Sequence, residues 1–152
     1  HQKSRDMRSI MDNLSFVMED ISKNLRTGYD YHCIDDGNLN TVNPHSCSAG
    51  GIGVSFKSGD GDQWIYYLGV NQSGTNGIFK RVDGGATVQI TPDEVAIDPT
   101  SSFVVRGAEP PPESPDDQQP FATIKLIGKI RYKNIDTPFS LQTSVSQRAI
   151  DI

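Results

Sequence analysis

The sequence lacks long apolar runs and is poor in leucine. None of its 152 residues belong to an apolar run of about 18 residues, the length expected of a membrane-spanning helix. Leucine occurs 6 times, against 14 isoleucines and 10 valines. Because branched Cβ atoms suit a pleated surface better than a helix, this composition predicts a domain rich in strands.

Motifs that mark common enzyme classes are also missing. The sequence contains no HExxH zinc motif, no phosphate-binding loop, no GxSxG nucleophile turn and no pair of carboxylates at catalytic spacing. We therefore expect no catalytic residue, no cofactor and no resident metal ion.

Charge is distributed unevenly along the chain. The formal net charge is −5, and residues 28–122 carry thirteen acidic against four basic side chains. Residues 1–27 and 123–152 each carry a small positive excess. An acidic surface repels phosphate, so nucleic acid is not an expected partner of the central segment.

The two cysteines, Cys33 and Cys47, close a loop of about 15 residues in a segment rich in Asp, Asn and Gly. A disulfide would stabilise such a segment by roughly 3 kcal/mol and would indicate an oxidising compartment. The neighbouring His32 and His45 leave a zinc site or a cysteine nucleophile as alternatives. The paired C-x2-C spacing of structural zinc sites is absent, however.

Residues 1–27 are predicted to form a helix whose apolar side chains recur in steps of three and four. Gly28 is expected to end it with positive φ, and His1–Lys3 offer no N-cap, so the helix is expected to continue upstream. Phe16 lies off the apolar stripe and is available for another contact. The residues predicted to pack on a sheet or against neighbouring subunits are Met7, Ile10, Met11, Leu14, Met18 and Ile21.

From Gly28 onward helical periodicity is lost. We interpret 28–51 as a disulfide-clipped loop and 52–152 as one antiparallel sheet, in which alternating apolar residues mark the strands. Residues 107–120 contain five prolines, which cannot join a ladder, and are predicted to form an exposed loop; a proline-rich ligand for another domain is the alternative. The predicted fold class is α+β, a single domain with a long N-terminal helix packed on an antiparallel sheet.

The last part of the chain predicts a long hairpin. Residues 122–133 alternate apolar and polar side chains, residues 134–138 are expected to turn, and Phe139, Leu141, Thr143 and Val145 are expected to face the core. One face of the first strand is basic and is predicted to be solvated, to contact an acidic surface of a neighbouring subunit or, as a third option, to bind nucleic acid. Its residues are Lys125, Lys129, Arg131 and Lys133.

Two segments resemble a known family. Residues 11–20 (MDNLSFVMED), with 24–28, resemble the exposed half of the first helix of type IV pilins and type II secretion pseudopilins. Residues 139–148 (FSLQTSVSQR) resemble the last strand of minor pilins and pseudopilins, and 103–107 fit the strand that precedes the proline-rich loop.

The resemblance implies a pilin-like fold without the apolar half of its helix, and a membrane-anchored precursor cut by a prepilin peptidase. The cleavage signature is expected upstream of His1. The product would be a structural subunit of a cell-surface or extracellular filament that serves adhesion, motility, DNA uptake or secretion. Its partners would be other pilin-like subunits and the inner-membrane assembly machinery.

A binding module is the alternative function. Trp64, Tyr66 and Tyr67 with residues 71–76 are a set that could stack on and hydrogen-bond a glycan, as in a secreted or surface-tethered adhesin. The same aromatic residues also suit a core strand.

Overall fold

The computed structural model describes residues 6–110 and 119–147. Strands make up 49% of these residues and helix 16%. The elements are α1 (Met7–Thr27), β1 (Tyr29–Ile34), β2 (Cys47–Gly51), β3 (Gly53–Lys57), β4 (Gln63–Val70), β5 (Asn76–Val82), β6 (Val88–Gln89), β7 (Val95–Ile97), β8 (Ser102–Arg106), β9 (Phe121–Tyr132) and β10 (Ile135–Ser146).

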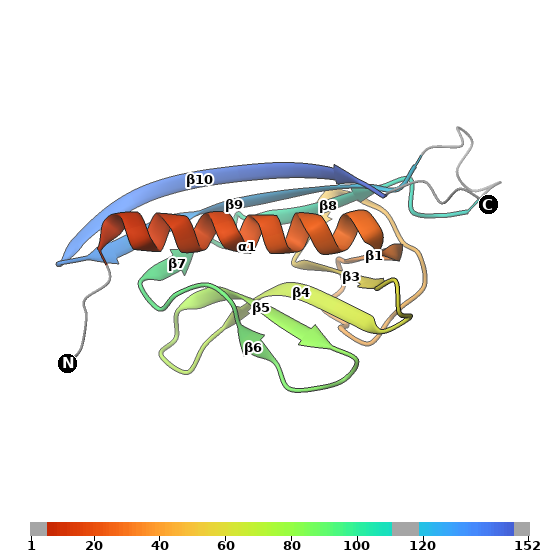
Figure 1. The fold of residues 1–152 in the computed structure, drawn as a ribbon, viewed down its shortest axis with the longest axis horizontal. Helices are drawn as coiled ribbons and strands as arrows, with labels where there is room; N and C mark the ends of the chain where they lie inside the picture. Colours follow the sequence, from red (N-terminus) through yellow and green to blue (C-terminus); the bar gives the residue numbers. More distant parts are fainter. Residues whose placement is uncertain (1–5, 111–118, 148–152) are drawn as a thin grey trace.

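The strands form two antiparallel sheets (Figure 1). The first sheet has the strand order β1-β3-β4-β5-β6. The second sheet has the order β10-β9-β8-β2, and β7 also pairs with β9. The predicted fold class, a long helix packed on one antiparallel sheet as in pilins, is therefore wrong. The chain is mostly β-structure, and its strands divide between two sheets.

Helix α1 lies along the long dimension of the molecule (Figure 1), and its side chains contact both sheets. One flank meets β10, where the Ser22 and Thr143 hydroxyls are 3.4 Å apart. The other flank meets the first sheet, where the Asn24 amide donates to the Tyr66 hydroxyl at 3.0 Å. The helix thus closes the space between two sheets.

The apolar face of α1 is buried in a core shared by both sheets. Its buried residues are Ile10, Leu14, Val17, Met18, Ile21 and Leu25. They pack with residues of both sheets, including Val54 and Phe56 of one and Ile124 and Leu126 of the other. Among the described residues, no helix combines the length and apolar character that crossing a bilayer requires.

Both ends of α1 differ from the sequence prediction. Asp6 is the N-cap and its carboxylate accepts from the Ser9 amide at 2.7 Å, so the helix begins at a local signal. Gly28 has φ −90° and is extended, so the helix does not end through a glycine with positive φ as predicted. A Cβ at Gly28 would meet Phe56 Cδ2 at 2.5 Å, and glycine is needed there because the helix end lies close to β3.

The segment 28–51 is not only a loop. It contains β1 and β2, and the intervening chain around His45 hydrogen-bonds to Tyr31 and Cys33 of β1. The expectation failed because β2 is rich in Gly and Ser and the chain between the two strands is rich in Asp and Asn, residues that single-sequence patterns assign to turns. The proline-rich segment 107–120 has no assigned strand in its described part, and residues 111–118 lie outside the described residues.

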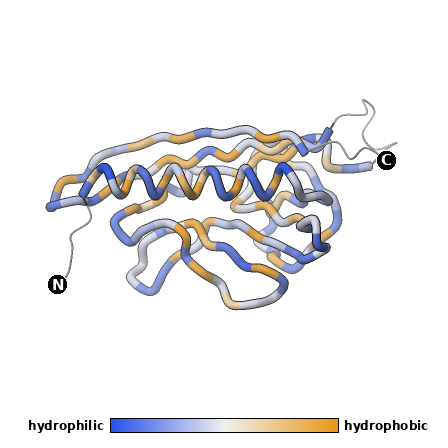
Figure 2. The backbone as a smooth tube through the Cα atoms, viewed as in Figure 1, coloured by the Kyte–Doolittle hydropathy of each residue, from blue (hydrophilic) through white to orange (hydrophobic). Residues whose placement is uncertain are grey.

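The predicted C-terminal hairpin is confirmed. Strands β9 and β10 pair in register over their full length, and hydropathy alternates along both (Figure 2). The turn is shorter than predicted: Lys133 and Asn134 have φ of 53° and 63°, as a two-residue type I′ turn requires. Residues 135–138 therefore belong to β10.

A hydrogen-bonded group fastens α1 to the first sheet. The Tyr66 hydroxyl donates to Asp20 at 2.8 Å, and Lys80 lies 3.3 Å from the same carboxylate. Lys80 also lies 4.4 Å from the centre of the Trp64 ring. Burial, with the hydrogen bond to Asp20, raises the pKa of Tyr66 well above its usual value, so the hydroxyl stays a donor.

We predict that Tyr66→Phe lowers the free energy of unfolding by about 2 kcal/mol, because Asp20 and Asn24 lose their shared partner. Urea denaturation measures the change. Tyr67→Phe is the matched control, since the Tyr67 ring stacks on Phe79 away from the helix. Equal losses in the two variants would show that the hydroxyl of Tyr66 does not hold α1 in place.

Candidate functional site

The two cysteines form a disulfide. Cys33 on β1 and Cys47 at the start of β2 are bonded, with Cα atoms 5.8 Å apart, and both are buried. The bond joins an edge strand of one sheet to an edge strand of the other. Because both sulfur atoms are in the disulfide, neither can act as a thiolate ligand or nucleophile.

Two histidines lie beside the disulfide. The rings of His32 and His45 are 5.3 Å apart. His32 Nδ1 contacts the Asn43 carbonyl at 2.6 Å, and His45 Nε2 contacts Asp35 at 2.8 Å. No group of three metal-ligating side chains occurs in residues 6–110 and 119–147, and the contacts described here hold the loop between β1 and β2.

Glu109 fixes the start of β2. Its carboxylate accepts from the Ser46 amide at 2.7 Å and from the Ser46 hydroxyl at 2.6 Å. Partial burial opposes ionisation, but these two hydrogen bonds outweigh it and hold the pKa of Glu109 below its usual value. The charged form is thus the one that the fold stabilises.

This depressed pKa makes a pH-dependent contribution to stability. It is fully present above pH 4.5, the usual pKa of the group, and is lost as pH falls through the lower folded pKa. We therefore predict that Glu109→Gln lowers the melting temperature at neutral pH, and that the difference from the parent shrinks on acidification. Thermal unfolding between about pH 7 and pH 3 measures it, with Glu94→Gln as the control. A difference independent of pH would contradict the assignment.

The predicted basic face is exposed but partly neutralised. Arg131 Nε lies 3.0 Å from Asp136, and Lys129 Nζ lies 3.9 Å from the same carboxylate. The Arg131 hydrogen bond lowers the pKa of Asp136. Lys133 belongs to the hairpin turn and lies over the Tyr132 ring, and Lys125 is exposed further along β9. These contacts support the interpretation of a solvated face.

The aromatic residues of the alternative glycan site are not on one surface. Tyr66 is fully buried, and Trp64 packs against the core. Tyr67 is half-buried and stacks on Phe79. The Asn71 side-chain oxygen Oδ1 accepts from the backbone amides of Ser73 and Thr75, so it shapes the turn between β4 and β5.

The helix residues predicted to pack or to contact other subunits separate into two groups. Ile10, Leu14, Met18 and Ile21 are buried in the core, and Met7 is partly buried against it. Met11 is 37% exposed and Phe16 is 69% exposed. Packing on the sheets is therefore the role of most of the predicted set, and only Met11 among them offers an exposed apolar side chain.

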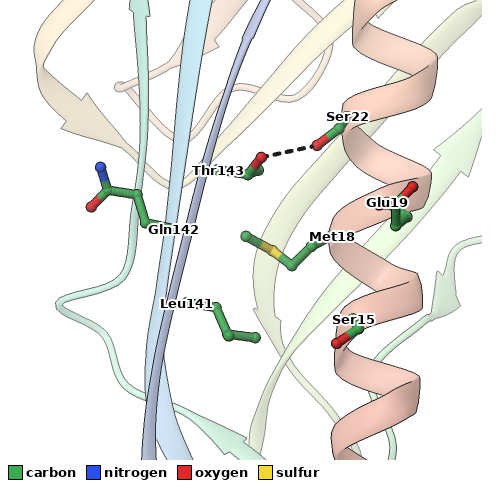
Figure 3. A pocket seen from close by; sticks show the side chains of 7 residues that line it. All are labelled: Ser15, Met18, Glu19, Ser22, Leu141, Gln142 and Thr143. Carbon is green, nitrogen blue, oxygen red and sulfur yellow. Dashed lines mark hydrogen bonds between the residues drawn. The ribbon is translucent and has the colours of Figure 1, made fainter.

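A groove runs between α1 and β10 (Figure 3). Its volume is about 260 Å³. The Met18 and Leu141 side chains extend into it from opposite sides, and Glu19 is the one charged side chain among the described residues that line it (Figure 3). The full lining is Ser15, Met18, Glu19, Ser22, Leu141, Gln142 and Thr143.

The outer face of α1 is the second exposed feature. We define it by five exposed side chains: Arg8, Asp12, Phe16, Glu19 and Lys23. Phe16 lies in the middle of this line of residues, with Asp12 and Glu19 about one turn away and Arg8 and Lys23 about two turns away along the helix. Aromatic residues are enriched at the centres of protein–protein interfaces, whose rims are polar.

The α1–β10 groove was missed at the sequence level, although each half carries a signal. Ser15 and Ser22 lie on the polar side of the helical stripe, and Leu141 and Thr143 lie on the inward face of the last strand. Only the pairing of distant elements brings them together. Comparisons of the chain with models of protein families, with curated proteins and with solved structures found no match.

Proposed function

We propose that this chain is a structural subunit of an extracytoplasmic filament of the type IV pilus or type II secretion kind, without a catalytic role. Neighbouring subunits contact it through the outer face of α1. The two-sheet architecture departs from the fold that the resemblance implies. The proposal therefore rests on the helix surface and on the sequence resemblance at residues 11–20, 24–28, 103–107 and 139–148.

The single observation that carries the proposal is the exposure of Phe16. A phenylalanine on the solvent side of a helix leaves 69% of its surface in water, and burying such a side chain stabilises a complex by roughly 1.5–3 kcal/mol. In a filament this contact repeats at every subunit. The mixed charges around Phe16 allow a neighbouring helix to pair with them without net repulsion.

The disulfide supports the proposed location. A buried Cys33–Cys47 bond forms in oxidising compartments and is rare in the cytosol. The glycan-binding alternative has less support, because Tyr66 is inside the core and is not available for stacking on a sugar.

We predict that Phe16→Ser reduces incorporation of the chain into sedimentable filaments at least about tenfold, because each factor of ten corresponds to about 1.4 kcal/mol and burial of the phenylalanine contributes at least that much. The melting temperature should stay unchanged because Phe16 packs outside the core. Quantitative immunoblots of sheared filament fractions, and immunogold labelling of the producing cells, measure the effect.

Val70→Ser is the matched control. Val70 is 65% exposed at the end of β4, so this substitution removes a similarly exposed apolar side chain away from α1. Equal incorporation of the Phe16 variant and the parent would refute the contact. Recovery of the parent only as a free secreted monomer would refute the filament itself.

A further inference from the structure

In the part of the chain that the structure describes, the two sheets have five edge strands, and four of them are short, irregular or covered. β6 and β7 have two and three residues. β2 pairs with β8 in an irregular register, and the outer side of β1 is hydrogen-bonded to His45. The fifth, β10, has twelve residues, pairs with β9 without a register shift and has no partner strand on its other side among the described residues.

Hydrogen bonds of β9 show which backbone groups of β10 point outward. The Arg131 amide donates to Glu94, and the Ile127 carbonyl accepts from Asp98, so odd-numbered residues of β9 face β7 and β8. Even-numbered residues of β9 therefore bond to β10, and their partners there are odd-numbered. The Gln147 amide, which donates to Pro120, follows the same pattern.

The even-numbered residues of β10 consequently point their N–H and C=O groups away from the sheet. They include Ser140, Gln142 and Ser144. Pro138 has the same orientation, which explains why a proline fits this strand: its missing N–H would not have joined the ladder.

This edge also lacks the charges that normally protect a free strand. Natural sheets guard exposed edges with lysine, proline, bulges or a covering segment. Near the turn, Asp136 and Pro138 disfavour pairing with another strand. The eight residues Phe139–Ser146 carry no charge and contain no bulge. An unguarded edge of this length is typical of a strand that receives a partner.

The α1–β10 groove lies beside the open edge and completes the site. A strand added to β10 would point alternate side chains over Met18 and Leu141, which line the groove. Among the described residues that line the groove, Glu19 alone is charged, so it favours a basic side chain in the added strand and disfavours an acidic one.

We propose that β10 is a docking edge for an extended segment of another polypeptide, which joins the sheet as an additional strand. The segment has small apolar side chains at every second position and a lysine or arginine near Glu19. The inference goes beyond the filament contact, because the edge binds such a segment whether or not the outer face of α1 assembles subunits.

The test uses a synthetic peptide of about ten residues that alternates valine and threonine and contains one lysine. We expect it to slow amide hydrogen exchange at Ser140, Gln142 and Ser144 at least about tenfold, while amides of odd-numbered neighbours, already bonded to β9, change little. The same peptide N-methylated at alternate amides should have no effect, because it cannot form the ladder.

Two protein variants separate backbone from side-chain recognition. Ser144→Pro removes one outward N–H and should weaken peptide binding about tenfold, whereas Ser144→Ala keeps it and should bind as the parent does. If Ser144→Pro fails to fold, the N-methylated peptide provides the same comparison on the unmodified protein.

Three results would overturn the proposal. One is equal protection by the normal and N-methylated peptides, and another is no protection at millimolar peptide. The third is protection of the outward amides that rises with protein concentration alone, which would identify a second copy of the chain as the occupant. None of these results depends on filament assembly, so they are distinguishable from failure of the Phe16 contact.

Discussion

Burial of one helix between two sheets is the interaction on which the structure depends. Three side chains of α1 are fully buried: Ile10, Leu14 and Ile21. They pack against apolar residues of both sheets, so the two sheets share one core. Polar side chains on the flanks of α1 then fix its position, with Ser22 at β10 and Asp20 and Asn24 at Tyr66. Without the helix, the inner faces of both sheets would be exposed along one side.

This placement also decides which surfaces remain for other molecules. A helix that fills a gap turns about half of its circumference outward, and here that half carries Phe16 in a line of charged residues. The same helix lies beside β10, and the outward backbone N–H and C=O groups of that strand have no partner strand among the described residues. Two exposed surfaces of different chemistry thus follow from one packing arrangement: an aromatic side chain among charged residues on α1, and a row of outward backbone groups on β10.

Local structure could be predicted from the sequence where the periodicity was strong. The stripe of apolar residues predicted α1. The alternation of apolar and polar residues over 122–133 and 139–145 predicted the hairpin and which of its faces points inward. Turn chemistry was less well predicted, because Lys133 and Asn134 adopt positive φ without a glycine. The assignment of strands to two sheets could not be predicted, since it depends on contacts between residues far apart in the sequence. The flanks of α1 carry serine, aspartate and asparagine, which a one-dimensional pattern assigns to solvent although they contact two sheets.

Nuclear Overhauser effects between side chains test whether α1 contacts both sheets at once. We expect simultaneous cross-peaks from the Met18 methyl group to Leu141 on β10 and from the Asn24 side-chain amide to the Tyr66 ring on β4. Cross-peaks to only one of these strands would place the helix on a single sheet. That result would contradict the shared core, and with it the outward orientation of Phe16 and the open edge beside the groove.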